Sequence, residues 1–226
     1  MTAPVMLRTA DAVFAAESAL RRAAEVVDEL GDVAASSLRV LDDAAVDSFH
    51  ARREERRDTY VESAGEHLDR LRNRSEVMRE LGEELARHID RASGAVDRVG
   101  AELEQALDGV AESVDVEALR MRVAALREVV TLAGPMVESI SAHAFHAAEA
   151  AQATDALMLL DNRVHEAGRE VSRADEGVSM MRTVLDHART HAQDSATLAS
   201  SLSRPGERSQ QMAPPRPRDA GPGLAI

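Results

Sequence analysis

The sequence predicts an all-α protein in which two tandem antiparallel helical hairpins form an elongated four-helix bundle or coiled coil. Three observations support this: apolar residues recur at spacings of three and four, aromatic residues make up only 2% of the chain, and the composition changes abruptly after Leu202. The spacing of three and four is that of one helix face. We expect a first hairpin over residues 1–113, a second over 114–203 and a disordered Pro- and Arg-rich tail over 204–226.

The composition favours closely packed helices over a sheet. Hydrophobic residues make up 44% of the 226 residues, which is enough to close a core. The aromatic residues are Phe14, Phe49, Tyr60 and Phe145, so the core must consist mainly of Ala, Val, Leu and Met. The chain has no cysteine, which excludes disulfides and thiolate metal sites.

Two copies of one tripeptide predict an internal repeat. Phe49-His50-Ala51 and Phe145-His146-Ala147 lie 96 residues apart, inside stretches that share one hydrophobic register. In the first copy the register is occupied by Leu20, Ala23, Val27, Leu30, Ala34, Ser37, Leu41 and Ala44. The matching positions of the second copy hold Val116, Leu119, Val123, Leu126, Val130, Ala133, Val137 and Ile140. The two halves are therefore predicted to be duplicated copies of a two-helix unit.

The first helix is expected to begin near Thr9 or Asp11, because either side chain can act as an N-cap. Its stripe continues past Gly31, which costs about 1 kcal/mol relative to Ala, as far as Leu41. Short polar side chains then cluster over Asp42–Ser48. Such a cluster favours a turn and a new helix cap, so we expect the first turn there.

The second helix is expected to run from Arg52 to about Val110, and the third from Val116 to about Ala133. Gly134-Pro135 then either ends or kinks the third helix, because proline lacks a backbone donor and disfavours helix at the preceding residue. If the helix ends there, Ser139 or Ser141 would cap the next helical segment.

The last helix has the most regular heptad pattern of the chain and is expected over Leu157–Leu202. Beyond it, Pro205, Pro214, Pro215, Pro217 and Pro222 lie among Gly, Ser, Gln and Arg residues. This composition cannot form a packed core, so residues 204–226 are predicted to be disordered.

The charge of the chain argues against nucleic acid as a partner. The formal net charge is −13, and such a field repels phosphate backbones. No stretch of ~18 apolar residues predicts a membrane span, and the first residues lack the order of a secretory signal. The compartment stays open: cytoplasmic, or exported without a conventional signal peptide.

No residue pattern in the chain predicts catalysis. His187 and His191 have the spacing that lets two imidazoles reach one metal ion, but no Glu-x-x-His pair and no hydrolytic zinc motif is present. No serine lies in Gly-x-Ser-x-Gly, and no glycine-rich loop resembles a phosphate-binding loop. We therefore expect a protein that is not an enzyme and has no cofactor and no metal, while the role of the two histidines stays open.

The segments Ala44-Ala45-x-x-x-Phe49 and Val114-Asp115-Val116-Glu117-Ala118-Leu119-Arg120 resemble the Trp-x-Gly helical hairpins of type VII secretion. This family consists of antiparallel hairpins of ~100 residues that pair with one another, a length similar to the repeat here. The family's Trp and Gly positions hold Leu41 and Asp43 in the first copy, and Val137 and Ser139 in the second. The export signal would place an acid four residues after Tyr60, where Ala64 stands.

The sequence thus predicts a non-enzymatic protein that binds a protein partner or itself through helix faces. The resemblance implies a substrate or partner of type VII secretion, and the alternative is a cytoplasmic coiled-coil scaffold or assembly protein. Granule-coating, pore-forming and metal-binding bundles are further alternatives. The predicted contact residues are Leu41, Phe49, Val137, Phe145, Leu157, Leu160, Val164, Val171, Val178 and Leu185.

Overall fold

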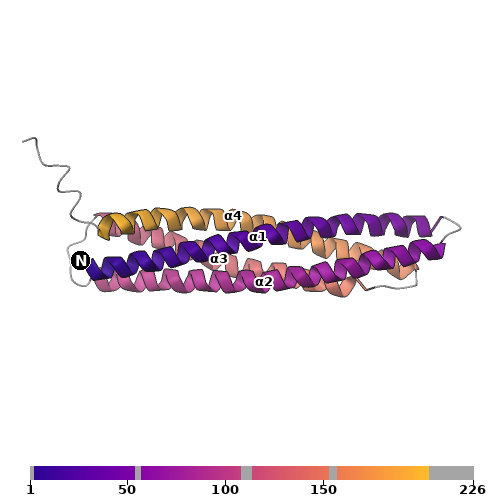
Figure 1. The fold of residues 1–226 in the computed structure, drawn as a ribbon, viewed down its shortest axis with the longest axis horizontal. Coiled ribbons are helices and arrows are strands. Elements are labelled where there is room, and N and C mark those ends of the chain that lie inside the picture. The colour runs from indigo at the N-terminus through magenta and orange to yellow at the C-terminus, as the bar shows by residue number, and fades with distance from the viewer. Residues whose placement is uncertain (1–2, 54–56, 108–113, 153–156, 204–226) are drawn as a thin grey trace, which may run out of the picture.

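The computed structural model describes residues 3–53, 57–107, 114–152 and 157–203, and all its regular structure is helical. The four helices are α1 (Ala3–Ala51), α2 (Arg57–Leu107), α3 (Val114–Ala150) and α4 (Leu157–Ser203). Figure 1 shows them side by side as a rod: α1 and α3 end, and α2 and α4 begin, at one end, and α1 begins at the other. The predicted all-α bundle is confirmed, whereas the predicted disordered tail over 204–226 lies outside the described residues.

The four long helices are antiparallel and pack pairwise around a common axis. Helix α1 packs against α2 and α4, and α3 packs against α2 and α4. The two predicted hairpin units, α1–α2 and α3–α4, therefore close into one bundle. One large cluster of buried residues draws on all four helices, among them Leu20, Leu85, Leu126 and Leu185. None of the helices in the described parts of the chain is long and apolar enough to cross a membrane.

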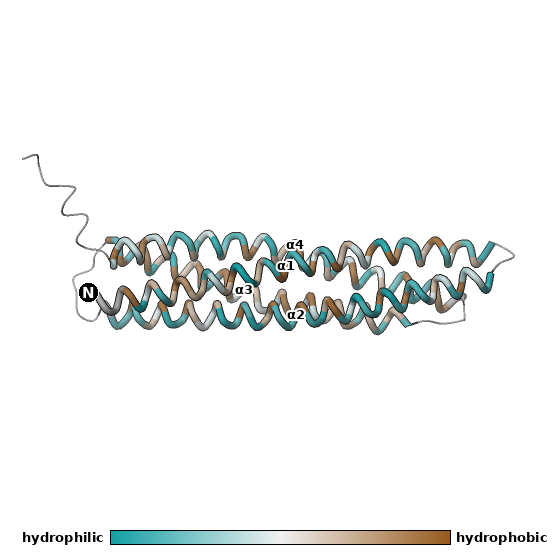
Figure 2. The backbone as a smooth tube through the Cα atoms, in the orientation of Figure 1, coloured by the Kyte–Doolittle hydropathy of each residue, from teal (hydrophilic) through white to brown (hydrophobic). Residues whose placement is uncertain are grey.

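The predicted apolar stripes form the interior of this bundle. All eight stripe positions of the first copy and all eight of the second are buried. Figure 2 shows the resulting alternation of apolar and polar residues along each helix. Burial of these side chains is the main favourable term that holds the helices together, because isolated helices are marginal in water.

The duplication itself stays a prediction. Helices α1 and α3 end at Ala51 and Ala150, 99 residues apart, and α2 and α4 begin at Arg57 and Leu157, 100 residues apart. The hairpin connections therefore do not keep the spacing of 96 that relates the stripes. A heptad pattern repeats every seven residues, so two helices can be aligned in only seven ways. Two unrelated bundle helices can therefore match in their apolar positions without a common origin.

The core is interrupted by a polar layer. The large cluster contains Ala34 and Met78, and a second cluster towards the hairpin connections contains Leu41 and Leu71. Between them, on α1 and α2, lie Ser37 and Ser75, both fully buried. The Ser37 hydroxyl donates to the carbonyl of Val33 at 2.8 Å, which satisfies it within its own helix.

The predicted first turn at Asp42–Ser48 is wrong, because α1 continues through this segment to Ala51 and α2 begins at Arg57 rather than Arg52. The reason is packing: Ala44 and Ser48 extend the buried stripe of α1. Tertiary burial of that stripe outweighs the weak preference of short polar residues for turns.

The predicted start at Thr9 or Asp11 is also wrong, because α1 begins at Ala3. Pro4 lies in the first turn, where a missing backbone donor costs nothing. Thr9 is fully buried inside the helix, so it continues the apolar stripe instead of capping it.

Helix α3 passes through Gly134-Pro135 without ending, so the alternative in which it ends there, with a new cap at Ser139 or Ser141, is wrong. Pro135 is exposed, while Ala133 and Val137 on either side are buried. Burial on both sides of the proline holds the chain helical despite the lost hydrogen bond. The prediction for the last helix is confirmed, since α4 covers Leu157–Ser203.

We predict opposite effects for two glycine substitutions. A Cβ at Gly177 of α4 would lie 2.8 Å from Cγ1 of Ile140 in α3, whereas a Cβ at Gly94 of α2 would meet nothing within 4 Å. Gly94→Ala should raise the free energy of unfolding by about 0.5–1 kcal/mol, because alanine favours helix. Gly177→Ala should lower it, because overpacking costs about 1–3 kcal/mol. Urea titration followed by circular dichroism measures both, and equal shifts would contradict the close approach of α3 and α4.

Candidate functional site

Most of the predicted contact residues lie inside the bundle. Those buried against other helices of the same chain are Leu41, Val137, Leu160, Val164, Val171, Val178 and Leu185. They are occupied by intramolecular packing and do not belong to the outer surface of this structure. Leu157 begins α4, but its side chain lies outside the described part of the structure. Phe49 and Phe145 are exposed, with 50% and 48% of their surface accessible.

Phe49 belongs to a small aromatic group near the end of α1. Its ring meets that of His50 edge to face at 5.8 Å, and the guanidinium of Arg53 lies 4.3 Å from its centroid. The His50 ring in turn stacks on Tyr60 of α2 at 5.3 Å. These contacts orient Phe49 and leave half of it free to meet another molecule.

Phe145 has different surroundings, although the predicted repeat would make it equivalent to Phe49. It borders a cleft of about 220 Å³ between α2 and α3, which is lined by Arg72, Ser75, Glu76, Arg79, Phe145, Ala148, Glu149 and Gln152. The Ser75 hydroxyl, which lines this cleft, is buried and has no hydrogen-bond partner among the described residues. The structure therefore does not bring the two phenylalanines into one site.

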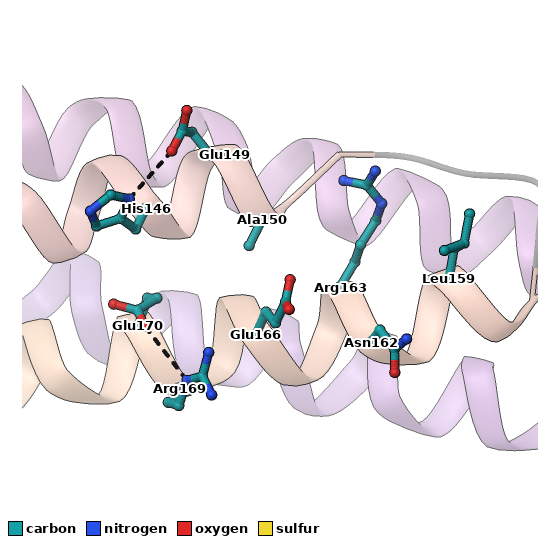
Figure 3. Close-up of a pocket in the computed structure, with 9 residues that line it drawn as sticks. All are labelled: His146, Glu149, Ala150, Leu159, Asn162, Arg163, Glu166, Arg169 and Glu170. Atoms are coloured by element: carbon teal, nitrogen blue, oxygen red, sulfur yellow. Dashed lines mark hydrogen bonds and ion pairs between the residues drawn. The ribbon is translucent and has the colours of Figure 1, made fainter.

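A larger groove of about 500 Å³ lies between α3 and α4, close to their connection. Figure 3 shows its lining: His146, Glu149 and Ala150 from α3 face Leu159, Asn162, Arg163, Glu166, Arg169 and Glu170 from α4. Carboxylates and guanidinium groups are interspersed along it, and no lining residue carries a hydroxyl, thiol or amine. The groove suits hydrogen bonding and ion pairing with polar groups.

Glu170 is the anchor of this groove. It is buried, and its Oε2 lies 2.8 Å from Nδ1 of His143 in α3. Its Oε1 accepts a hydrogen bond from Nη1 of Arg173 at 3.0 Å and lies 3.5 Å from Nε of Arg169. Burial by itself would raise the pKa of Glu170, but the hydrogen bond to His143 and the charges of Arg173 and Arg169 outweigh it and hold the pKa below its ordinary value.

The sequence contained a signal for Glu170 that pattern reading missed. It directly precedes the stripe residue Val171 and lies between Arg169 and Arg173. An acidic residue at the edge of a buried stripe, flanked by arginines on the same helix, predicts a charge network. Identifying its partner on another helix requires knowing how the two helices are aligned. That partner is His143 of α3.

His187 and His191 lie on α4, the former exposed and the latter partly buried. Within the described residues no group of three or more His, Asp or Glu side chains is arranged to hold a metal ion. Their spacing alone therefore identifies no site, and their role stays open.

The chain matches no protein-family model, no curated protein and no solved structure. The resemblance to Trp-x-Gly hairpins accordingly stays a prediction.

We predict that Glu170→Gln destabilises the bundle in a pH-dependent way. Because the folded pKa of Glu170 is lowered, its stabilisation is complete above the unfolded pKa and is lost as the pH falls through the folded pKa. The variant should lose about 1–3 kcal/mol of unfolding free energy at pH 7, and its deficit should shrink as the solution is acidified. Urea titrations from pH 7 to pH 3 measure this difference. Glu166→Gln, an exposed neighbour in the same groove, is the control and should show no such trend.

Proposed function

We propose that the protein is a non-enzymatic helical bundle that binds other protein chains through its outer helix faces. The observation that carries this proposal is the outer face of α3. There Met121 and Leu132 leave 67% and 59% of their surface accessible, although the bundle already has a closed core. Large apolar side chains gathered on one face of a folded protein mark interaction surfaces.

The secretion-related form of this proposal makes the chain a substrate or partner of type VII secretion. It is supported by the paired antiparallel hairpins, which are the arrangement that the Trp-x-Gly resemblance implies. Here both hairpins belong to one chain, and each buries the apolar stripes of the other. A partner would therefore bind the outer surface of the bundle rather than the apolar face of a single hairpin.

The alternative is a scaffold that holds partners at separate points along a rod. Its support is shape: α1 has 49 residues, which span about 74 Å at the rise of an α-helix. Phe14 is exposed near the start of α1, whereas Phe49 and Phe145 are exposed near the ends of α1 and α3, at the opposite end of the rod.

Photo-crosslinking in the cells that make the protein tests the proposal. A photoreactive residue in place of Leu132 or Phe145 should give one recurring adduct, whether with another protein or with a second copy. The control is the exposed Thr183 on α4, which should give none. Absence of adducts from both α3 positions, or equal adducts from all three, would contradict a partner surface on α3.

Export separates the two forms of the proposal. If the chain belongs to type VII secretion, culture filtrate from a strain without the export ATPase should lack the protein, while filtrate from the parent strain contains it. Retention in the cells of both strains would select the scaffold. Immunoblotting of filtrate and cell fractions, with a cytoplasmic marker as lysis control, measures the outcome.

A further inference from the structure

The cleft between α2 and α3 is lined by a buried polar group that has no partner. Ser75 is fully buried, and its hydroxyl has no hydrogen-bond partner among the described residues. Leaving a buried hydroxyl unpaired costs stability, so native proteins usually pair such groups with protein atoms or with a bound molecule. An unpaired hydroxyl in the wall of a cleft is therefore a position at which a polar group of a bound molecule would be stabilised.

The two walls of the cleft are held in a fixed register. Asp97 of α2 pairs with Arg127 of α3, with 3.0 Å between Oδ1 and Nε. Because the helices are antiparallel, equal steps from this pair reach residues at the same level. Eighteen residues before Asp97 is Arg79, and eighteen after Arg127 is Phe145. At Gly82 the helices approach so closely that an added Cβ would displace an α3 side chain, so the Phe145 ring lies at the closed end of the cleft.

Arg72 and Glu76 place a charge of each sign on the α2 wall. Nε of Arg72 lies 3.9 Å from Oε1 of Glu76, which is too long for a hydrogen bond, and 54% of each side chain is accessible. Each group can therefore still form a hydrogen bond with a ligand. Two opposite charges at this separation suit a molecule whose own positive and negative groups are close together.

The other two charged groups of the lining have partners in the chain. Arg79 pairs with Glu83, one turn further along α2, and Glu149 of α3 pairs with His146 at 3.3 Å. The lining as a whole therefore holds two guanidinium groups and two carboxylates. A ligand with only one sign of charge would be repelled by two of these groups, whereas a ligand with both signs can face its complements.

The cleft also has room for an apolar group. Its volume of about 220 Å³ exceeds the ~150 Å³ of an engineered apolar cavity that binds benzene. Phe145, with 48% of its surface accessible, and the partly buried Ala148 form the apolar part of the lining. An aromatic ring of a ligand can pack there against Phe145, either edge to face or offset-stacked.

From these features we infer that the cleft binds a free α-amino acid with an apolar side chain, best an aromatic one. Its ammonium group binds Glu76, its carboxylate binds Arg72, and its side chain packs against Phe145. Both charged groups of an α-amino acid are attached to one carbon, which matches the short separation of Arg72 and Glu76. The Ser75 hydroxyl gains its missing partner, because it can donate to the carboxylate or accept from the ammonium group. This binding goes beyond the proposed function and does not depend on it.

Isothermal titration calorimetry on the full chain tests the ligand class with three matched probes. L-Phenylalanine carries both charges, 3-phenylpropanoate lacks the ammonium group, and 2-phenylethylamine lacks the carboxylate. Phenylalanine should bind saturably with one molecule per chain, and each analogue should bind at least tenfold more weakly. Absence of saturable phenylalanine binding, or an analogue that binds within tenfold of it, would overturn the inference.

Variants of the lining test the location. Ala148→Met fills the cleft and should abolish phenylalanine binding, and Ser75→Ala should weaken it. Glu166→Gln, an exposed position in the neighbouring groove between α3 and α4, is the control and should leave binding unchanged. Circular dichroism confirms that the variants are folded. Binding that survives Ala148→Met, or that Glu166→Gln reduces as much as Ser75→Ala does, would place the ligand elsewhere and overturn the site.

Charge-specific variants test the orientation of the ligand. Glu76→Gln should weaken phenylalanine binding at least tenfold but should not weaken 3-phenylpropanoate, which has no ammonium group. Arg72→Gln should weaken both of these carboxylates and should not weaken 2-phenylethylamine. Equal losses for all three probes in either variant would overturn the assigned contacts. Such a failure would leave the cross-linking test of the proposed function intact, because Leu132 does not line the cleft.

Discussion

The structure depends on close packing of small aliphatic side chains between four helices. The fully buried positions are mostly Ala, Val and Leu, and the three phenylalanines are all exposed. Without aromatic side chains to fill space, the helices must approach closely; at Gly177, for example, an added Cβ would lie 2.8 Å from Cγ1 of Ile140. Small side chains also explain the length of the helices. Each turn buries only a small apolar area, so many turns are needed to reach a stable free energy of unfolding.

The same constraint explains which predictions hold. The stripe positions and the bounds of α4 follow from a strong periodic pattern, and burial imposes such periodicity on a bundle helix. The wrong predictions ended or started a helix at residues whose local preferences disfavour the helix interior. These were the polar run Asp42–Ser48, the pair Gly134-Pro135 and the cap candidate Thr9. In each case the stripe continued across the break, and the burial of its residues outweighed a local preference of about 1 kcal/mol per residue, or about 3 for proline.

The candidate site was harder to predict because it depends on contacts between helices. The pairing of His143 with Glu170 requires the register of α3 against α4, and no single-helix pattern contains it. Phe49 and Phe145 were found from their repeated tripeptide, yet their surroundings differ: Arg53 lies over the ring of Phe49, whereas Phe145 borders a cleft between α2 and α3. Most predicted contact residues proved internal, since a stripe facing the chain's own helices and one facing a partner have the same spacing.

The layer of Ser37 and Ser75 divides the bundle into a long segment and a short one at the hairpin connections. The short segment is held by the smaller cluster of buried residues, and the serines contribute little apolar burial at the junction. We expect this to weaken the cooperativity between the two segments, with the short segment opening at a lower free energy than the long one. Amide protons around Leu68 and Ala167 would then exchange with solvent faster than those around Leu85 and Leu126, with the long segment still folded.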